Sequence, residues 1–392
     1  MKKIVLILGL LFVSIISHAV YAVDVKVGGE YRLRFENREP TNFNQAGPTD
    51  RFVLQRTRLN FEGKFENGVG FFAEIQDSRT WGNETTTLTQ MSFIDLHQGY
   101  FTFGKDIKWK LGRQELAYGK QRLLGATGWS NIGRSFDAVK TSVLLFDREL
   151  DIFYAKVSEN VTTTLQGDNV DLAGLYFKGE GFEPYLLNKN DLNLQSNRST
   201  LGARLFGDLA GGKFDLEGMY QTGGIGAKTI AAYAGAVNFA YPVMAGALLN
   251  VEMNYASGDD NAADNTVKTF DQLYPTNHGK YGLADIVGFQ NLLSYRAEVQ
   301  LNVFEKSQLM LGVVLLNKAE ANDFVYSSTG VKHAQDAGNT ETAIGSEYFI
   351  HYQTQLEDNI GFNAGLSLFN PGKALNGTAS QTWSYVQTSL KF

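Results

Sequence analysis

The chain has no cysteine among its 392 residues, and only six of them are proline. Without cysteine it has neither a disulfide framework nor a thiol nucleophile. Histidine is also scarce after residue 22, and none stands near a serine or carboxylate motif typical of a catalytic triad. Sequence spacing alone leaves open an enzyme in which the fold brings His and Ser together from distant segments. The histidines after residue 22 are His97, His278, His333 and His351.

A long apolar run is missing beyond residue 22. Before that point, two lysines precede an apolar stretch at residues 4–16, and a small residue ends the segment. This pattern is typical of a cleaved secretory signal, and the stretch is too short for a transmembrane helix. We predict a signal peptide at residues 1–22 and one domain at residues 23–392. Such a chain can cross a membrane only as a closed β-barrel, whose backbone groups bond between strands.

Charge of a single sign is also missing, because 35 basic and 41 acidic residues leave a formal net charge of −6. A mildly acidic chain is not expected to bind nucleic acid. Glycine and aromatic residues are abundant instead, with 41 Gly, 27 Phe and 18 Tyr. These residues suit the tight turns and interfacial aromatic girdles of a membrane barrel.

Apolar and charged side chains alternate strictly at residues 28–36, and the pattern returns at residues 55–65. Successive side chains of a strand point to opposite faces, so each segment has one apolar and one ionic face. This arrangement fits a transmembrane barrel with lipid outside and water inside. The ionic face carries Glu30, Arg32, Arg34, Glu36, Arg56, Arg58, Glu62 and Lys64.

Short turns, one of them expected at residues 241–242, alternate along the chain with long polar connections, such as those at residues 117–133, 257–285 and 318–341. A secreted β-sandwich also alternates, but this alternation of connection lengths is typical of periplasmic turns and extracellular loops. The chain also ends on an aromatic residue, Phe392, which resembles the assembly signal of bacterial outer-membrane barrels. We predict an all-β, antiparallel barrel of about 18 strands, with 16 as the alternative because two segments are weak. The candidate strands start near residues 25, 51, 69, 92, 107, 134, 149, 170, 183, 199, 212, 229, 245, 291, 307, 342, 359 and 384.

Four arginines, Arg32, Arg34, Arg56 and Arg58, fall on the inferred lumen face of the first two strands. Neighbouring strands lie about 4.8 Å apart, so these guanidinium groups are close enough to form one cationic wall. Such a wall would bind carboxylates by two-point contacts, unless neighbouring glutamates pair with it. Later strands place mainly acidic residues in the lumen, which would create the transverse field of a general porin. Those lumen residues are Asp215, Glu217, Glu252, Glu298 and Glu347, with Arg204 and Arg296.

The densest motifs are GRQELAYGKQRLLG at residues 112–125 and WSNIGRSFDAVK at residues 129–140. With RTRL at residues 56–59 and FDQLYPTNHGKYGLAD at residues 270–285, they make the chain resemble the alginate export family of outer-membrane barrels. The resemblance implies an 18-stranded barrel in a Gram-negative outer membrane, with an arginine-rich pore that passes anionic polysaccharide without a cofactor. The pore residues it implies are Arg32, Arg34, Arg56, Arg58, Arg113, Arg122 and Arg134, with Asp137 as an ion-pair partner.

The long connection at residues 117–133 is expected to fold inward and bring Arg122 to a constriction, because loops on rigid scaffolds carry specificity. The alternative is a surface loop whose Tyr118 and Trp129 lie at the lipid headgroups. A second loop, at residues 257–285, holds acidic side chains that supply the oxygen ligands Ca²⁺ prefers. A solvated acidic loop is the alternative there. The candidate ligands are Asp259, Asp260 and Asp264.

These observations predict a passive outer-membrane channel for an anionic solute, an acidic polysaccharide or oligosaccharide such as alginate. The alternative is a general or differently selective porin for small solutes. We expect a monomer that is not an enzyme, that contacts outer-membrane lipids and a periplasmic secretion partner, and that binds no nucleic acid. A structural barrel or adhesin would need no conducting pore.

Overall fold

The computed structural model describes residues 23–84, 94–159 and 169–392, which contain strands and no helix. The predicted signal peptide at residues 1–22 lies outside this part of the chain. No helix among the described residues is long and apolar enough to cross a membrane. The first ten strands are β1 (Val23–Glu39), β2 (Asp50–Phe65), β3 (Gly70–Thr80), β4 (Ile94–Phe103), β5 (Ile107–Gln114), β6 (Phe136–Leu145), β7 (Arg148–Ser158), β8 (Val170–Lys178), β9 (Phe182–Asp191) and β10 (Ser196–Leu209).

The second half of the chain adds nine strands to the same sheet. One of them, β14, is a two-residue segment in a loop that pairs in parallel with β12. The other eight continue the antiparallel wall, so the barrel has 18 strands. These nine are β11 (Gly212–Ile225), β12 (Lys228–Met244), β13 (Ala247–Ala256), β14 (Thr266–Val267), β15 (Leu292–Phe304), β16 (Ser307–Asn317), β17 (Ala343–Glu357), β18 (Ile360–Pro371) and β19 (Gln381–Lys391).

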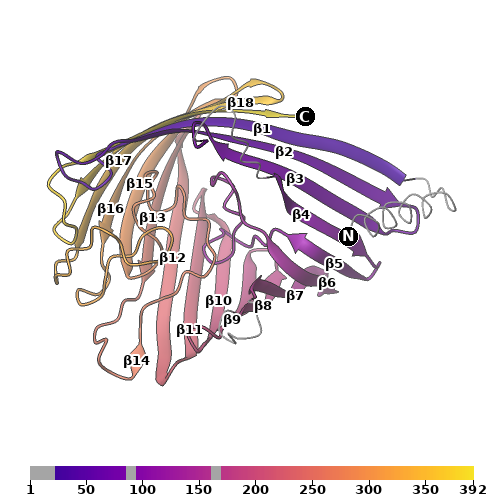
Figure 1. Ribbon diagram of the computed structural model, residues 1–392, viewed down its shortest axis with the longest axis horizontal. Coiled ribbons are helices and arrows are strands. Elements are labelled where there is room, and N and C mark those ends of the chain that lie inside the picture. The colour runs from indigo at the N-terminus through magenta and orange to yellow at the C-terminus, as the bar shows by residue number, and fades with distance from the viewer. Residues whose placement is uncertain (1–22, 85–93, 160–168) are drawn as a thin grey trace.

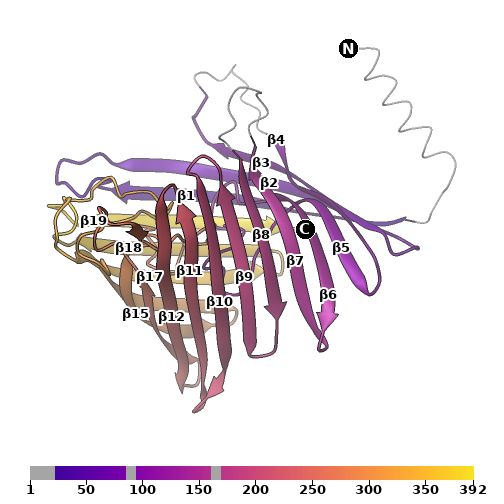
Figure 2. The ribbon, with the colours of Figure 1, turned by 90° about the horizontal axis from the view of Figure 1, so that it is seen from below.

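The barrel closes where the first and last strands meet, because β1 pairs with β2 on one side and with β19 on the other. Figure 1 shows the indigo β1 beside the yellow C-terminal strands, and Figure 2 shows the wall from β6 to β12. The Phe392 carbonyl also accepts a hydrogen bond from Gly29 N over 2.9 Å. Among the described strands, closure leaves no unpaired sheet edge, as lipid requires of a membrane protein built from strands.

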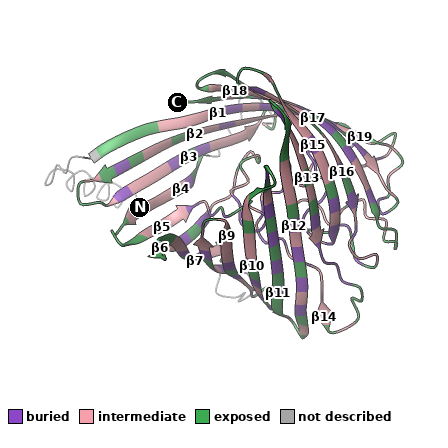
Figure 3. Ribbon diagram, turned by 180° about the vertical axis from the view of Figure 1, so that it is seen from behind, coloured by how far each residue is buried: buried purple, intermediate pink, exposed green. Residues whose placement is uncertain are grey.

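The two faces of the wall differ as the alternating sequence predicts. On β1, Phe35 is 43% exposed on the outer face, whereas Arg34 beside it is 2% exposed on the inner face. Figure 3 shows this alternation of burial along the strands. Since exposed apolar residues recur on the outer face of strand after strand, as at Leu201 and Leu366, that face is the one that contacts lipid.

The predicted strand starts agree with the structure to within a few residues, including the two weak segments near 183 and 229, which are β9 and β12. The count is therefore 18 and not 16. A turn expected at residues 241–242 is wrong. β12 runs through Pro242 to Met244 with a bulge between them, and the chain turns at Gly246, where φ is 76°. A bulge accommodates proline inside a sheet.

Three loops from the long-connection end fill much of the barrel, at residues 115–135, 257–291 and 318–342. The first is the magenta segment that runs across the middle of Figure 1. Phe270, Ala284 and Phe289 of the second loop are fully buried and form part of the hydrophobic core. The barrel interior is therefore a packed, loop-filled space rather than an open cylinder.

Candidate functional site

The loop at residues 117–133, which we call the strap, crosses the lumen between opposite walls. Its first half pairs with the loop at residues 257–291. Leu124 forms a parallel bridge with Tyr274, and Gly125 N donates to the Tyr274 carbonyl over 2.9 Å. Leu124 is 1% exposed. The strap thus lies inside the barrel, as the inward interpretation predicts, and not among the lipid headgroups.

The arginines of β1 and β2 hold the second half of the strap. Arg32 donates to the carbonyls of Gly128 over 2.7 Å, Trp129 over 3.2 Å and Ser130 over 2.8 Å. Arg56 donates to two of the same carbonyls, those of Gly128 and Ser130, over 3.2 and 3.1 Å. The strap therefore covers the predicted cationic wall, and its backbone takes hydrogen bonds that a solute would otherwise receive.

In the lumen, the Trp129 ring lies between a cationic side chain and a second aromatic ring. The Arg34 guanidinium stands 3.7 Å above its ring, and the ring stacks on His278 with centroids 3.8 Å apart. Arg34 also donates to the Trp129 carbonyl over 2.7 Å. Cation–π and stacking contacts of this kind fix the ring on both faces. Trp129 is an anchor of the strap to the wall.

Three of the four wall arginines also pair with carboxylates. Arg34 lies 2.7 Å from Glu36 and Arg56 lies 2.6 Å from Glu30. Arg32 has no carboxylate within 4 Å among the described residues. The arginines are therefore clustered, and the glutamates compensate most of their charge, while binding of a solute by the wall stays a prediction. Arg58 completes the cluster, with Glu74 at 3.5 Å.

The far end of the strap is tied to the opposite wall through Arg122, which is 4% exposed. Its guanidinium lies 3.5 Å from Glu217 on β11 and 3.0 Å from Glu252 on β13. Burial by itself would lower the pKa of Arg122, but the carboxylates of Glu252 and Glu217 raise it above its usual range. Arg122 is therefore a fully compensated anchor of the strap, not a free binding group.

Arg134 follows the strap and donates only to carbonyls, those of Gly125 over 3.1 Å, Pro275 over 2.8 Å and Tyr274. Burial lowers the pKa of Arg134 to about 10, so the side chain stays charged at neutral pH. No carboxylate pairs with it among the described residues. Just before it, Gly133 has a φ of 82°, and a Cβ there would lie 2.6 Å from Arg58 Nη2. Glycine thus allows the strap to approach the wall.

Arg113 and Asp137 do not line the lumen. Arg113 shares a face of β5 with Leu111, and Asp137 shares a face of β6 with Val139, which is 46% exposed to the outside. The two side chains pair with each other over 2.9 Å on that outer face. The expectation of a pore role is wrong for this pair, because the alternation of β5 continues through Gly112 and turns Arg113 outward.

Two lysines in the lumen were missed because the sequence argument weighed arginine alone. Lys120 of the strap is half exposed and lies 3.6 Å from Asp215. The half-buried Lys280 has no carboxylate within 4 Å among the described residues, and burial together with nearby Arg122 lowers its pKa to about 8. Both lysines lie within the sequence motifs described above, Lys120 in GKQR and Lys280 in HGKYG.

A model of the alginate export family matches residues 23–389. The chain belongs to the alginate export family. No curated protein sequence matches it. The family match and the porin-like fold support an outer-membrane channel. The protein is located in the bacterial outer membrane.

Solved structures of porin-like barrels have the same fold as this alginate export family member. OccK11 (OpdR) of Pseudomonas aeruginosa is 12% identical, with 94% of this chain and 96% of that chain covered and a TM-score of 0.63. OpdK of P. aeruginosa, solved with vanillate, is 11% identical over 94% and 98%, with a TM-score of 0.65. A BenF-like porin from P. fluorescens Pf-5 is 13% identical over 94% and 99%, with a TM-score of 0.64. At such identities the likeness concerns the fold alone.

The acidic loop of this family member engages its aspartates locally. Asp260 forms an ion pair with Lys268, and the Asp264 carboxylate accepts a hydrogen bond from Thr266 N over 2.7 Å. Asp259 accepts one from Asn261 N over 3.2 Å. In the part of the chain that the structure describes, no three His, Asp or Glu side chains are grouped to hold a metal ion. The expected Ca²⁺ site gains no support from this geometry and stays a prediction.

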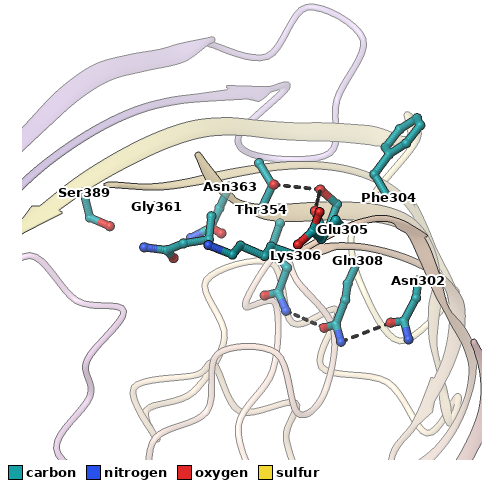
Figure 4. A pocket seen from close by; sticks show the side chains of 12 residues that line it. Asn302, Phe304, Glu305, Lys306, Gln308, Thr354, Gly361, Asn363 and Ser389 are labelled. Carbon is teal, nitrogen blue, oxygen red and sulfur yellow. Dashed lines mark hydrogen bonds between the residues drawn. The ribbon is translucent and has the colours of Figure 1, made fainter. Parts of the chain in front are cut away.

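At the periplasmic end, amide and hydroxyl side chains line the lumen beside Glu305 and Lys306. A polar pocket of about 720 Å³ lies beside the turn between β15 and β16. In its amide chain, Gln353 donates to Gln308 over 2.7 Å, and Gln308 donates to Asn302 over 3.4 Å. Figure 4 shows Gln308 and Asn302 in this chain. Amide and hydroxyl side chains of this kind can donate hydrogen bonds to the hydroxyl groups of a ligand or accept them.

Proposed function

We propose that this outer-membrane channel passes acidic saccharides passively through the space beside the strap. The observation that carries the proposal is a set of three cations near the strap that lack a carboxylate partner among the described residues: Arg32, Arg134 and Lys280. Several other lumen bases are paired, as in Arg204 with Asp215 and Arg296 with Glu298, although Arg38 on β1 and Lys110 on β5 also have no carboxylate within 4 Å among the described residues. Uncompensated positive charge at a narrow place favours the entry of anions.

A porin for small solutes is the second candidate, and the packing of the loops favours it. Phe270, Ala284 and Phe289 are fully buried in the interior, so the loops leave little room for a bulky polymer. Short acidic oligosaccharides satisfy both observations, since they carry the required charge and need less space than a full polysaccharide. We also propose that the channel works as a monomer without enzymatic activity or cofactor.

Bilayer conductance of the purified protein tests the charge argument. Anions should permeate better than cations, and glucuronate oligomers should block the current of small ions from one side. Lys280→Gln should lower the anion preference by a modest factor, more at low salt, because the Debye length is about 8 Å at physiological salt. The control is Lys306→Gln at the periplasmic turn, where the lysine pairs with Asp358 over 3.0 Å. Cation preference of the wild type would refute the proposal.

A further inference from the structure

A row of amide side chains crosses the lumen face of five neighbouring strands at the periplasmic end, and we call it the amide row. Asn302 of β15 lies opposite Gln308 of β16, which lies opposite Gln353 of β17. Asn363 of β18 and Gln387 of β19 continue the row. The first four amides line the polar pocket of about 720 Å³ beside the turn between β15 and β16. This volume is in the range of pockets that hold one drug-sized molecule.

Much of the hydrogen-bonding capacity in this pocket is unused. The Asn363 side chain and the Ser389 hydroxyl have no hydrogen-bond partner among the described residues, and both are partly exposed. Gln353 donates through Nε2, but its Oε1 accepts no hydrogen bond from these residues. Figure 4 shows Asn363, Gly361 and Ser389 in the pocket. A Cβ at Gly361 would lie 3.0 Å from Ser389 Oγ, so the glycine keeps this hydroxyl accessible to a ligand.

The charges of the lining favour an uncharged ligand. Lys306 at the turn pairs with Asp358 over 3.0 Å, which compensates its charge. Glu305 beside it also lines the pocket and has no basic partner within 4 Å among the described residues. Arg32 lies opposite Ser389 across the β1–β19 pair, but its side chain is 5% exposed and is bound to the strap carbonyls. A carboxylate in the pocket would therefore be repelled by Glu305, whereas a neutral molecule would not.

We propose that the amide row and Ser389 form a binding site for one uncharged, polyhydroxylated molecule about the size of a disaccharide. Ligand hydroxyls donate to Gln353 Oε1 and accept from the Nδ2 groups of Asn302 and Asn363. Because neighbouring strands lie about 4.8 Å apart, successive amides reach hydroxyl groups spread along the length of such a molecule. The site goes beyond the proposed function, since it selects hydroxyl groups and not negative charge.

Block of single-channel current tests the site in the intact barrel. The probe is cellobiose, an uncharged disaccharide, added to both sides of the bilayer. The control probe is tetraethylene glycol dimethyl ether, an uncharged chain that has no hydroxyl group. Cellobiose should lower the current to a saturating level, whereas the ether should lower it only as far as it lowers the conductivity of the bulk solution. Block by cellobiose that does not saturate would overturn the inference, as would equal saturation by the ether.

Two variants of similar side-chain volume locate the site on the barrel wall. Asn363→Leu and Gln353→Leu each remove an amide, so each should raise the half-saturation concentration of cellobiose about fivefold through the lost hydrogen bonds. The matched control is Asn188→Leu, because Asn188 shares the outer face of β9 with Leu186, which is 43% exposed. This exchange should leave the block unchanged. Heat-modifiable mobility in gels shows that each variant has assembled, and an unchanged block in both pocket variants would reject the site.

The preference for an uncharged ligand is tested with cellobionate, the acid derived from cellobiose. At low salt it should bind several-fold more weakly than cellobiose, because salt screens the charge of Glu305 least there. Glu305→Gln should narrow this difference without changing the block by cellobiose. Cellobionate that binds the wild type as tightly as cellobiose would overturn the preference for uncharged ligands.

The ion selectivity of the same channels separates this inference from the proposed function. An anion-selective channel without saturable block by cellobiose would reject the amide site alone. A cation-selective channel that cellobiose still blocks, with weaker block in Asn363→Leu, would retain the site and refute the proposed function.

Discussion

The contacts of Arg32 in the structure differ from the solute-binding role that its place in the sequence predicts. Three strap carbonyls surround its guanidinium, and no carboxylate pairs with it among the described residues. Hydrogen bonds to a charged group contribute about 1.5–3 kcal/mol, more than neutral ones. The residue therefore both fixes the strap and leaves one positive charge in the lumen without a carboxylate partner.

Replacing Arg32 should loosen the strap at its β1 contact. Arg32→Ala is expected to raise single-channel conductance and current noise and to reduce anion preference, because both the anchor and the charge are lost. Arg32→Lys should retain the anion preference but still increase the current noise, since lysine cannot contact all three carbonyls in a fixed geometry. The control is Arg51→Ala, because Arg51 forms an exposed ion pair with Glu39 on the outer side of the barrel. A current trace in Arg32→Ala identical to that of the wild type would rule out the anchoring role.

Lys280 should make selectivity depend on pH. Burial lowers its pKa to about 8, so the ammonium is charged below that pH and loses its proton as the pH rises through 8. The groups that face it are Arg122, Lys120, Glu252 and Glu217. Anion preference should therefore fall between pH 7 and 9, as measured by reversal potentials in a salt gradient. Lys280→Arg should abolish this fall, and a fall that persists in this variant would assign it to another group.

At the scale of elements, the strap joins walls that are far apart in the sheet. Arg32 and Arg56 hold it to β1 and β2, while Arg122 ties it to β11 and β13. The strands themselves could be predicted from the sequence, because an alternation with a period of two residues is a local property of the chain. The end of β12 was misplaced because a proline suggested a turn where a bulge carries the strand on.

Removing the strap should open the lumen. A variant in which residues 119–131 are replaced by two glycines is expected to conduct several-fold more current and to lose most of its ion preference, because the cross-lumen segment is gone. The barrel should still assemble, since no ladder hydrogen bond between neighbouring strands of the described wall belongs to these residues. Single-channel recording measures the effect. Conductance at the wild-type level would mean that the loops at residues 257–291 and 318–342 alone form the constriction.

At the scale of the whole molecule, closure joins the two ends of the chain. The backbones of Phe392 and Gly29 exchange hydrogen bonds of 2.9 and 3.2 Å, and the ring of Phe392 is 63% exposed. Such a residue contributes little internal packing, so its aromatic ring is available to assembly factors and lipid.

Deletion of Phe392 should lower the amount of assembled barrel in the outer membrane without changing the conductance of those molecules that insert. Heat-modifiable mobility in gels measures assembly, and bilayer recording measures conductance. Phe146→Ala is the matched control, because Phe146 is an exposed phenylalanine at another periplasmic turn. Wild-type yield after deletion of Phe392 would contradict its role in assembly.

The sequence by itself determined the class of the molecule, its strands, its two faces and its family resemblance, since alternation, turn residues and motif blocks are all local in the chain. It also indicated which arginines gather on β1 and β2. Only the tertiary structure decided which of those charges stay uncompensated and that Lys280 and Arg134 lie near the strap. Those properties depend on loops separated by more than a hundred residues that meet in the lumen, and no local pattern records where a loop folds after it leaves its strand.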